Sequence, residues 1–469
     1  MRRWAILAVA AVTGCASYSG IEPRATSTDP ATLKAEASLG QGSGAWPELD
    51  WWKRFGDPQL DALIEEGLAG SPNIRLAQAR LDAASAAARI AGAARSPQVG
   101  ASGDVTRQRF SENYIFPPPI GGSTYTTTQL ALNASYELDF WGKNRSAYEA
   151  ALGRTRAAEA EKYAARLVLA SALAGVYVQL ERSYEELDLA RRTLEDREKV
   201  QSLTNDRVRA GLDSKLELKQ VETSIPAARA RVAQAEEAIA LSRSQLAALL
   251  GKGPDRGLGI ERPNLRLAAV TLPSNVPADL LGRRPDIVAS RLRAEAAAKD
   301  IASAKAAFYP DVNLSALIGV QSISLSHLLD PASAIPSLGA AVRLPILDGG
   351  RLRGNLAARD AEYDAAVEQY NRSLADALRE VVDQLTSMRS VQAQRAEADA
   401  ALASAEEAYS LALTRYKAGI GSLLQVITVE TQVLDQRALR TELHSRELAL
   451  SINLIRALGG GFDVTMAMQ

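Results

Sequence analysis

The chain has 469 residues, enough for two or three ordinary domains, with 54 basic and 55 acidic side chains and a formal charge of −1. It lacks the dense basic blocks of a nucleic-acid-binding protein, so no nucleic-acid partner is expected. One cysteine and two histidines exclude a disulfide framework and argue against a multi-ligand metal site. Aromatic residues make up 5% and alanine-rich stretches recur, which predicts long helices rather than a compact enzyme. Past the N-terminus, no run approaches the ~20 apolar residues of a membrane-spanning helix.

The N-terminus has the pattern of a bacterial lipoprotein signal. Two arginines precede an apolar run over residues 4–12, and the sequence Val-Thr-Gly-Cys15 follows. This ending resembles a lipobox and predicts a signal peptide over 1–14, with a covalent lipid such as palmitate on Cys15 and no other cofactor. Ala16 stands where an aspartate commonly retains lipoproteins in the inner membrane, which favours the outer membrane. The alternative is an ordinary signal followed by an incidental cysteine.

The rest of the chain consists of an internal sequence repeat. Segments 207–223 and 415–431 share eight of seventeen residues at an offset of 208. Two pairs of prolines keep an offset of 213: Pro72 with Pro285 and Pro97 with Pro310. We therefore predict a first repeat and a second repeat separated by a linker. The full division is a lipid-anchored N-terminal segment over 15–57, repeats over 58–251 and 285–462, a linker over 252–284, and a tail over 463–469.

Each repeat is predicted to contain long helices. Shorter helices over 72–95 and 285–308 begin with proline, which the first turn of a helix tolerates. The proline-free stretch 143–206 corresponds to a helix of roughly 95 Å, and 351–417 to one of roughly 100 Å. Each ends at an Ala-Gly pair, and a returning helix follows. In the first repeat that helix has a coiled-coil seam, with Pro226 expected to bend it. The seam comprises Leu218, Val221, Ile225, Ala228, Val232, Ala235, Ile239, Ser242, Leu246 and Leu249.

Between these helices the hydrophobic period changes to two. We predict strands over about 98–110, 125–140, 311–323 and 337–347, with long loops over 110–125 and 322–337. Such alternation suits either a soluble sheet packed on helices or a membrane sheet with lipid on one face and water on the other. The lipoprotein signal favours the membrane, where four strands are too few to close a barrel, so several chains must share one. Leu132, Tyr136, Leu314 and Val342 would then face lipid, and Asn133, Ser135 and Asn313 would face water.

These features together resemble one family. The matching residues are Cys15, the segment 280–287 (LLGRRPDI), the pairs Ala210-Gly211 and Ala418-Gly419, and the ending 457–461 (ALGGG). The chain is similar to the TolC-like outer-membrane efflux proteins, in their OprM/NodT-type lipoprotein branch. The resemblance implies a mainly α protein with a membrane β-barrel. It implies a homotrimer with a twelve-stranded barrel, a periplasmic coiled-coil tunnel and an equatorial region around residues 252–286.

The implied function is passive conduction. Such proteins are the exit duct of tripartite RND pumps, and their partners are a periplasmic adaptor, an inner-membrane transporter and outer-membrane lipid. The expected location is the outer membrane, lipid-anchored, with a large periplasmic part and with loops 110–125 and 322–337 outside. The alternative is a non-conducting periplasmic coiled-coil lipoprotein, either an adaptor or a structural spacer. No enzyme is expected, because His327 and His444 are isolated and no catalytic motif is present.

The resemblance places a periplasmic gate at the two repeated turns. Gly421 stands where related channels often carry an acid, and Asp213 occupies its counterpart in the first repeat, so an acidic ring from the second turn is doubtful. Pairing of Arg209 with Asp213 across chains would hold the gate closed. The alternative is that these charges are solvated helix ends. The candidate gate and adaptor-contact residues are Asp206, Arg209, Gly211, Asp213, Ser214, Arg415, Lys417, Gly419, Gly421 and Ser422.

Overall fold

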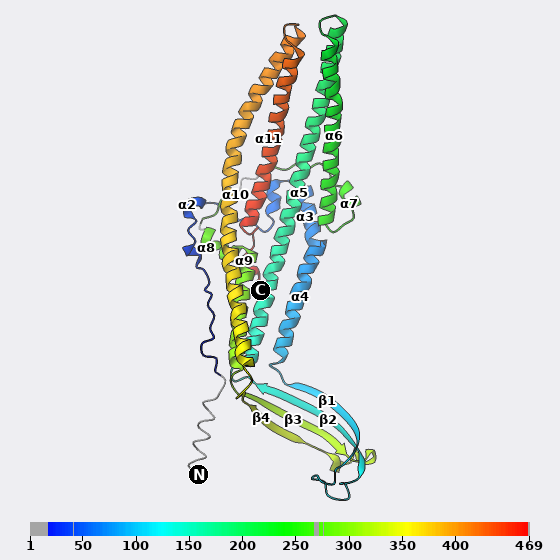
Figure 1. Ribbon diagram of the computed structural model, residues 1–469, viewed down its shortest axis with the longest axis vertical. Helices are drawn as coiled ribbons and strands as arrows, with labels where there is room; N and C mark the ends of the chain where they lie inside the picture. Colours follow the sequence, from blue (N-terminus) through cyan, green and yellow to red (C-terminus); the bar gives the residue numbers. More distant parts are fainter. Residues whose placement is uncertain (1–16, 41, 267–271, 275, 468–469) are drawn as a thin grey trace. The chain divides into compact units, whose positions relative to one another are not determined.

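The computed structural model describes residues 17–40, 42–266, 272–274 and 276–467 (Figure 1). In both repeats a helix leads into two strands, then into a 67-residue helix and a 35-residue returning helix. The duplicated order predicted from the sequence is confirmed. The first repeat contains α4 (Pro72–Ala93), β1 (Gln98–Arg109), β2 (Thr124–Leu138), α5 (Lys143–Arg209) and α6 (Lys215–Leu249). The second contains α9 (Pro285–Ala306), β3 (Asp311–Ser322), β4 (Ser337–Arg343), α10 (Arg351–Lys417) and α11 (Leu423–Ala457).

Short elements surround the repeats, and the chain divides into two compact units. The short helices are α2 (Glu36–Leu39), α3 (Pro58–Gly70), α7 (Asp255–Leu258) and α8 (Val276–Arg283). The 3-10 turns are η1 (Pro30–Thr32), η2 (Trp51–Phe55), η3 (Leu325–His327), η4 (Pro331–Ser333) and η5 (Val464–Ala467). Described residues of the strand unit are 17–27, 81–158 and 290–370, and those of the helical unit are 28–80, 159–289 and 371–467, without the gaps named above.

The strand unit contains one antiparallel sheet in the order β1-β2-β3-β4. Leu132 pairs with Ile318 and Tyr136 with Leu314, while Val312 pairs with Val342, so these apolar side chains share one face. Asn133, Ser135 and Asn313 lie on the other face, as predicted. The apolar face is solvent-exposed in the single chain: the exposed fraction is 53% for Leu132, 65% for Ile318 and 70% for Val342.

Several element ends differ from the sequence predictions. Strand β4 ends at Arg343 rather than 347, which leaves Leu344 and Ile346 outside it, because Pro345 has no N–H to donate to a strand ladder. Strand β2 ends at Leu138 rather than 140, where a turn through Gly142 (φ 75°) begins. Helix α5 continues to Arg209, three residues beyond the predicted end. Helices α4 and α9 each end two residues earlier than predicted, at Ala93 and Ala306.

Helix ends and the N-terminal segment form the rest of the strand unit. Phe308, Leu352 and Leu356 are buried in a small cluster on which Tyr18 and Ile21 pack. The rings of Tyr18 and Phe308 meet edge to face at 5.4 Å. The backbone N–H groups of residues 24 and 25 both donate to one carboxylate oxygen of Asp364 at 2.9 Å. Residues just after the predicted lipid site are therefore bound to helix α10.

A buried cluster in the helical unit joins residues from several elements. Turn η2 supplies Trp51, Trp52 and Phe55, helix α3 supplies Leu60, Leu63 and Ile64, and helices α5, α6 and α11 supply the facing apolar stripes. In α6, seven of the ten predicted seam residues are buried, and Leu218, Val232 and Leu249 are half-buried. Pro226 lies within this continuous helix.

One described helix, α5, contains a window long and apolar enough to cross a membrane by length and composition, which the sequence did not predict. In that window 44% of the residues are buried inside the chain. Leu169, Leu173 and Leu180 of this helix belong to the helical core. Packing against other helices is therefore a sufficient explanation for its apolar character.

Candidate functional site: the two helix-hairpin turns

The two repeated turns have the same backbone. After α5, Gly211 adopts φ 76°, and the N–H of Leu212 donates to the carbonyl of Arg207 at 2.9 Å. After α10, Gly419 adopts φ 79°, and the N–H of Ile420 donates to the carbonyl of Arg415 at 3.0 Å. Both glycines are therefore in the left-handed conformation that closes a helix, where a side chain would be strained. We call residues 207–214 the first turn and residues 415–422 the second turn.

A serine starts the returning helix after each turn. The Ser214 hydroxyl accepts from the N–H of Leu216 at 3.1 Å, and the N–H of Ser214 donates to Glu217 at 2.9 Å. This reciprocal arrangement is a capping box. Ser422 makes the simpler cap, accepting from the N–H of Gln425 at 3.3 Å. Both caps satisfy helix N–H groups that have no partner inside the helix.

A buried polar cluster connects the first turn to helix α10. Arg207 donates to both carboxylate oxygens of Asp213, at 2.8 and 3.1 Å, and to the carbonyl of Tyr416 at 2.8 Å. The Arg207 guanidinium also lies 4.4 Å from the centre of the Tyr416 ring. The Tyr416 hydroxyl donates to Asp213 at 2.6 Å and lies 3.0 Å from the Thr204 hydroxyl. We call Thr204, Arg207, Asp213 and Tyr416 the turn cluster.

Burial strengthens these contacts. Tyr416 and Thr204 have exposed fractions of 0%, and Arg207 of 8%. Hydrogen bonds from Arg207 and Tyr416 lower the pKa of Asp213 despite its partial burial. Burial, followed by the hydrogen bond to Asp213, raises the pKa of Tyr416. Asp213 is thus ionised and Tyr416 neutral at pH 7, which is the combination that the observed donors and acceptors require.

The predicted gate residues differ in their partners and in their exposure. Asp213 is held by Arg207 of its own chain, not by Arg209, which pairs instead with Asp206 at 3.2 Å in an exposed ion pair. Arg415 and Lys417 are exposed and have no carboxylate partner among the described residues. Gly421 packs so closely that an added Cβ would lie 3.1 Å from both the Cβ of Arg415 and the N of Tyr416. A larger residue at 421 would therefore require its neighbours to move.

Sequence reasoning missed Arg207, Tyr416 and Thr204. Arg207 matches Arg415 in the repeat, which was a signal for a turn arginine. Tyr416 has no such signal, because its counterpart is Val208 and only the packing of α10 against the first turn brings it to Asp213. Cys15, the predicted lipid attachment site, and the predicted signal peptide lie outside the described residues.

Each turn and the first residues of the helix that follows it also expose two apolar side chains at equivalent positions. Leu212 and Leu216 have exposed fractions of 64% and 65%, and their repeat counterparts Ile420 and Leu424 have 69% and 64%. Beneath them, Val221, Leu423 and Val426 form a buried cluster with Tyr416. The turns therefore combine a packed interior with an unpartnered apolar surface.

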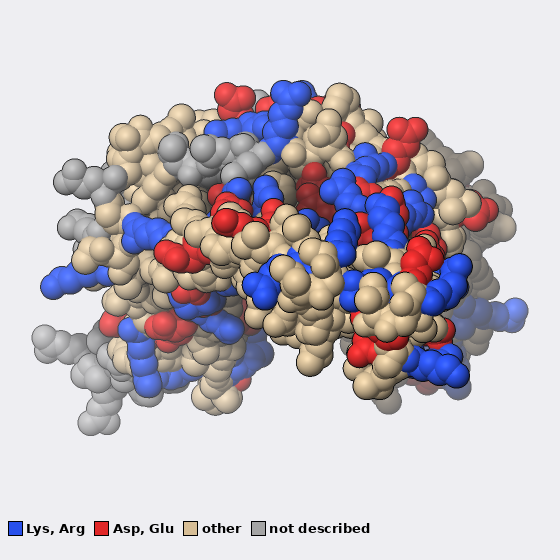
Figure 2. Space-filling model, turned by 90° about the horizontal axis from the view of Figure 1, so that it is seen from above, with Lys and Arg blue, Asp and Glu red and all other residues tan. Residues whose placement is uncertain are grey.

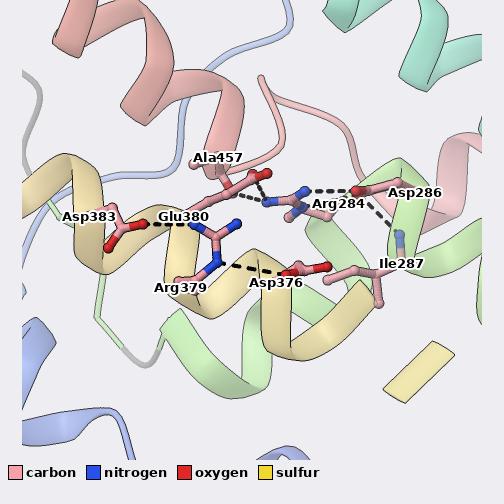
Figure 3. A network of polar contacts seen from close by, with 8 residues as sticks. All are labelled: Arg284, Asp286, Ile287, Asp376, Arg379, Glu380, Asp383 and Ala457. Atoms are coloured by element: carbon pink, nitrogen blue, oxygen red, sulfur yellow. Dashed lines mark hydrogen bonds and ion pairs between the residues drawn. The ribbon is translucent and has the colours of Figure 1, made fainter. Parts of the chain in front are cut away.

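The motif 280–287 forms a second polar network in the helical unit (Figure 3). Arg284, with an exposed fraction of 8%, donates to Asp286 at 2.7 and 3.0 Å, to Glu380 at 2.9 Å and to the carbonyl of Ala457 at 3.2 Å. One guanidinium thereby joins the start of α9, the middle of α10 and the end of α11. This role is structural, because the bidentate guanidinium of Arg284 holds three helices in contact.

Charged side chains elsewhere are mixed in sign. Figure 2 shows acidic and basic side chains lying next to one another across the face in view. Many of them form pairs three or four residues apart on the long helices, such as Lys199 with Glu195 at 2.8 Å and Arg379 with Asp383 at 2.8 Å. Such pairs are typical of solvated helix faces and contribute little individually.

Comparison with known proteins identifies the family. The family model described as "Outer membrane efflux protein" matches residues 63–252 and 276–460. The chain belongs to the outer membrane efflux protein family. It is 39% identical over 364 residues to the fusaric acid resistance protein FusA of Burkholderia cepacia, which covers 76% of this chain and 69% of FusA. It is 32% identical over 466 residues to the multidrug resistance outer membrane protein MdtP of Escherichia coli K12, which covers 96% and 94%.

A solved structure supports the same assignment. The outer membrane protein VceC of Vibrio cholerae matches with a TM-score of 0.85 and 40% identity, covering 89% of this chain and 100% of VceC. The resemblance to TolC-like channels is therefore confirmed, as are the efflux function and the outer-membrane location. The outer membrane efflux proteins are channel proteins. The sequence motifs that this chain shares with them lie in the Arg284 network and in the two turns.

Proposed function

We propose that this outer membrane efflux protein is the exit duct of a tripartite pump, assembled from three copies and gated at the two turns. The observation that carries the proposal is the sheet. One of its faces is apolar and exposed, and the outer edges of β1 and β4 have no partner strand among the described residues. The resistance functions in the names of FusA and MdtP support small molecules as the conducted substrates.

The sheet explains why several chains are needed. In lipid, an unpaired backbone group costs several kcal/mol, so β1 and β4 require partners from other copies. Two copies would give eight strands, whose interior fills with side chains, whereas three give twelve and leave room for a duct. A stable detergent-solubilised monomer or dimer in light scattering would contradict this assembly.

The turn cluster supplies a gate. Asp213 and Arg207 belong to the α5–α6 hairpin and Tyr416 to the α10–α11 hairpin, so the two hairpins are connected through a few hydrogen bonds. Such a connection has two arrangements, joined and separated, and a binding partner can bias their populations. The exposed pairs Leu212 with Leu216 and Ile420 with Leu424 give a periplasmic adaptor an apolar contact on each hairpin. The adaptor would in turn join the duct to an inner-membrane RND-type transporter.

Lipid on Cys15 would assist targeting rather than hold the trimer together. Two or more acyl chains anchor a protein stably to a membrane, where one binds reversibly, but the apolar face of the sheet supplies its own lipid contact. We expect Cys15→Ser to lose metabolic labelling by a fatty acid while trimers still form. Label that persists in the Ser variant would remove Cys15 from this role.

Reconstitution into planar bilayers tests the duct directly. We expect the wild-type protein to form channels that are closed or poorly conducting at rest. Leu132→Lys places a charge on the apolar face and should cost about 2–4 kcal/mol near the bilayer midplane, which would abolish stable insertion. Asn133→Lys is the matched control on the neighbouring residue and the opposite face, and it should insert normally. Equal insertion of the two variants would contradict the membrane position of the sheet.

A further inference from the structure

Residues 261–266, here called the strap, follow helix α7 and lie on the helical unit. The backbone of Glu261 exchanges two hydrogen bonds with the Gln59 side chain, at 2.8 and 3.2 Å. At the other end, the N–H of Arg266 donates to the carbonyl of Phe55 at 2.9 Å. Leu265 is buried, with an exposed fraction of 8%, in the core that Trp51 and Phe55 also form. The strap is thus attached along its whole length to η2, α3 and α5.

Two buried carboxylates hold the middle of the strap. Asp57 accepts the N–H of Asn264 at 2.8 Å, together with the Tyr177 hydroxyl at 2.8 Å and the N–H of Gln59 at 2.9 Å. Glu181 of helix α5 accepts the N–H of Leu265 at 3.1 Å. The exposed fractions are 6% for Asp57 and 9% for Glu181. Adjacent strap amides are therefore bound by carboxylates that come from two different elements.

The two carboxylates differ in how well they are satisfied. Both oxygens of Asp57 accept hydrogen bonds, and the carboxylate caps helix α3. Glu181 uses one oxygen only, and its Oε2 is buried without a hydrogen-bond partner among the described residues. Burying an ionised carboxylate with an unpartnered oxygen costs much more than burying the neutral carboxyl, because only the ionised form loses the solvation of a charge. The site therefore favours a neutral Glu181.

We propose that Glu181 is a pH-sensitive latch: in its protonated form it keeps the strap docked on α3 and α5, and its ionisation releases residues 264 and 265. The groups around it agree with this role. Glu185 on its own helix and Asp57 opposite add negative charge, Tyr177 adds a neutral hydroxyl, and Arg262 of the strap adds positive charge. Arg262 is itself paired with Asp188 at 2.7 Å, which reduces its help to Glu181.

The direction of the pH dependence follows from these contacts. Burial raises the pKa of Glu181 to about 7; the Leu265 N–H opposes this shift, Glu185 and Asp57 add to it, and Arg262 opposes it. Because the docked carboxyl binds its proton more tightly than the released one, docking is strongest at acidic pH. Its stabilising contribution is complete below the ordinary glutamate value of 4.5 and is lost as the pH rises through about 7.

Amide hydrogen exchange of the full-length protein in detergent tests the latch. Protection of the strap peptide, corrected for the chemical exchange rate, is compared at pH 6 and pH 8. A carboxyl with a pKa of about 7 when docked and 4.5 when released makes the released fraction about tenfold larger at pH 8 than at pH 6. Glu181→Gln keeps the carbonyl acceptor without a titratable proton, so its protection should be equal at both pH values.

Glu195→Gln is the matched control, because Glu195 lies on the same helix in an exposed pair with Lys199. This variant should show the same tenfold change as the wild type. Equal wild-type protection at the two pH values, or a tenfold change that persists in Glu181→Gln, would overturn the proposal. If Glu181→Gln does not fold, the wild-type titration decides: a midpoint near pH 7 in the strap but not in α10 supports the latch, and a change shared by both peptides refutes it.

Discussion

The first and second turns have one backbone and two different sets of side-chain contacts. Both contain a left-handed glycine and a capping serine, and each exposes one apolar residue in the turn and one in the following helix, at an offset of 208. Only the first turn carries an acid, Asp213, and that acid is bound by Arg207 and Tyr416. In the second turn Gly421 replaces the acid, and Arg415 is exposed without a carboxylate partner among the described residues. Duplication has thus kept the hairpin geometry while the polar contacts diverged.

This difference separates residues that form the hairpin from residues that connect the two hairpins. The glycines and serines are needed to make a hairpin, so both copies retain them. The contacts of Asp213 join the second hairpin to the first through Tyr416, and the second turn has no acid to repeat them. Arg207 against Arg415 is therefore the most informative pair of equivalent positions in the molecule.

The largest expected effect is that of Arg207→Ala. This change leaves Asp213 without its cation and the Tyr416 carbonyl without a donor, which should destabilise the closed first turn by about 3 kcal/mol. Arg415→Ala, at the equivalent exposed position, should change stability by less than about 0.5 kcal/mol. Amide exchange of the turn peptides measures the free energy of local opening, and single-channel recording should show higher conductance for Arg207→Ala alone. Equal effects of the two variants would mean that the turns are functionally alike.

Acid should act on the first turn and spare the second. The pKa of Asp213 is lowered by Arg207 and Tyr416, so its contribution is complete above the ordinary value of 3.8 and is lost as the pH falls through the lowered pKa. Amide exchange of the first turn should therefore increase on acidification below pH 3.8, and exchange of the second turn should increase less. Asp213→Asn should abolish the difference between the turns in this response. A second turn as acid-sensitive as the first would contradict the assignment.

Tyr416→Phe should have an intermediate effect. The ring remains beneath Arg207, but the hydroxyl that donates to Asp213 at 2.6 Å is lost, and we expect a cost of about 1–2 kcal/mol. Tyr409→Phe, seven residues earlier on α10, is a control for the loss of a hydroxyl outside the turn cluster. Chemical unfolding and amide exchange of both variants would separate the two effects. A larger change in Tyr409→Phe would remove the Tyr416 hydroxyl from the connection between hairpins.

The smallest effects should come from the shared features. Ser214→Ala and Ser422→Ala each remove a helix cap and should each cost about 1 kcal/mol. The loss at Ser214 should be slightly larger, because the Ser214 hydroxyl also donates to the Glu217 carboxylate, whereas the backbone N–H that completes the capping box remains in alanine. Arg209→Ala breaks only an exposed pair with Asp206 and should cost between about 0 and 1 kcal/mol. A cost at Arg209 above that at Arg207 would restore the predicted pairing of Arg209 with Asp213 across chains.

The sequence by itself determined the local and periodic features of this protein. Its repeated prolines and glycines predicted where helices of the two repeats begin and end, because a proline at a helix start and a glycine at a helix end act within one turn of chain. The alternation of apolar residues predicted the two faces of the sheet, because side chains in a strand alternate whatever their partners are. Strand β4 was predicted too long only because the same alternation continues past Pro345.

Contacts between distant segments were decided by the tertiary structure alone. Tyr416 reaches Asp213 across 203 residues, and Arg284 reaches Ala457 across 173. No spacing or composition encodes such pairs, since they depend on which helix faces pack together. The same holds for Glu181: on a helix with many acidic residues, only its packing against the strap buries it and leaves one oxygen without a partner. Local pattern sets the elements, whereas burial and the choice of partner, which set the chemistry of a charged group, exist only after those elements have packed.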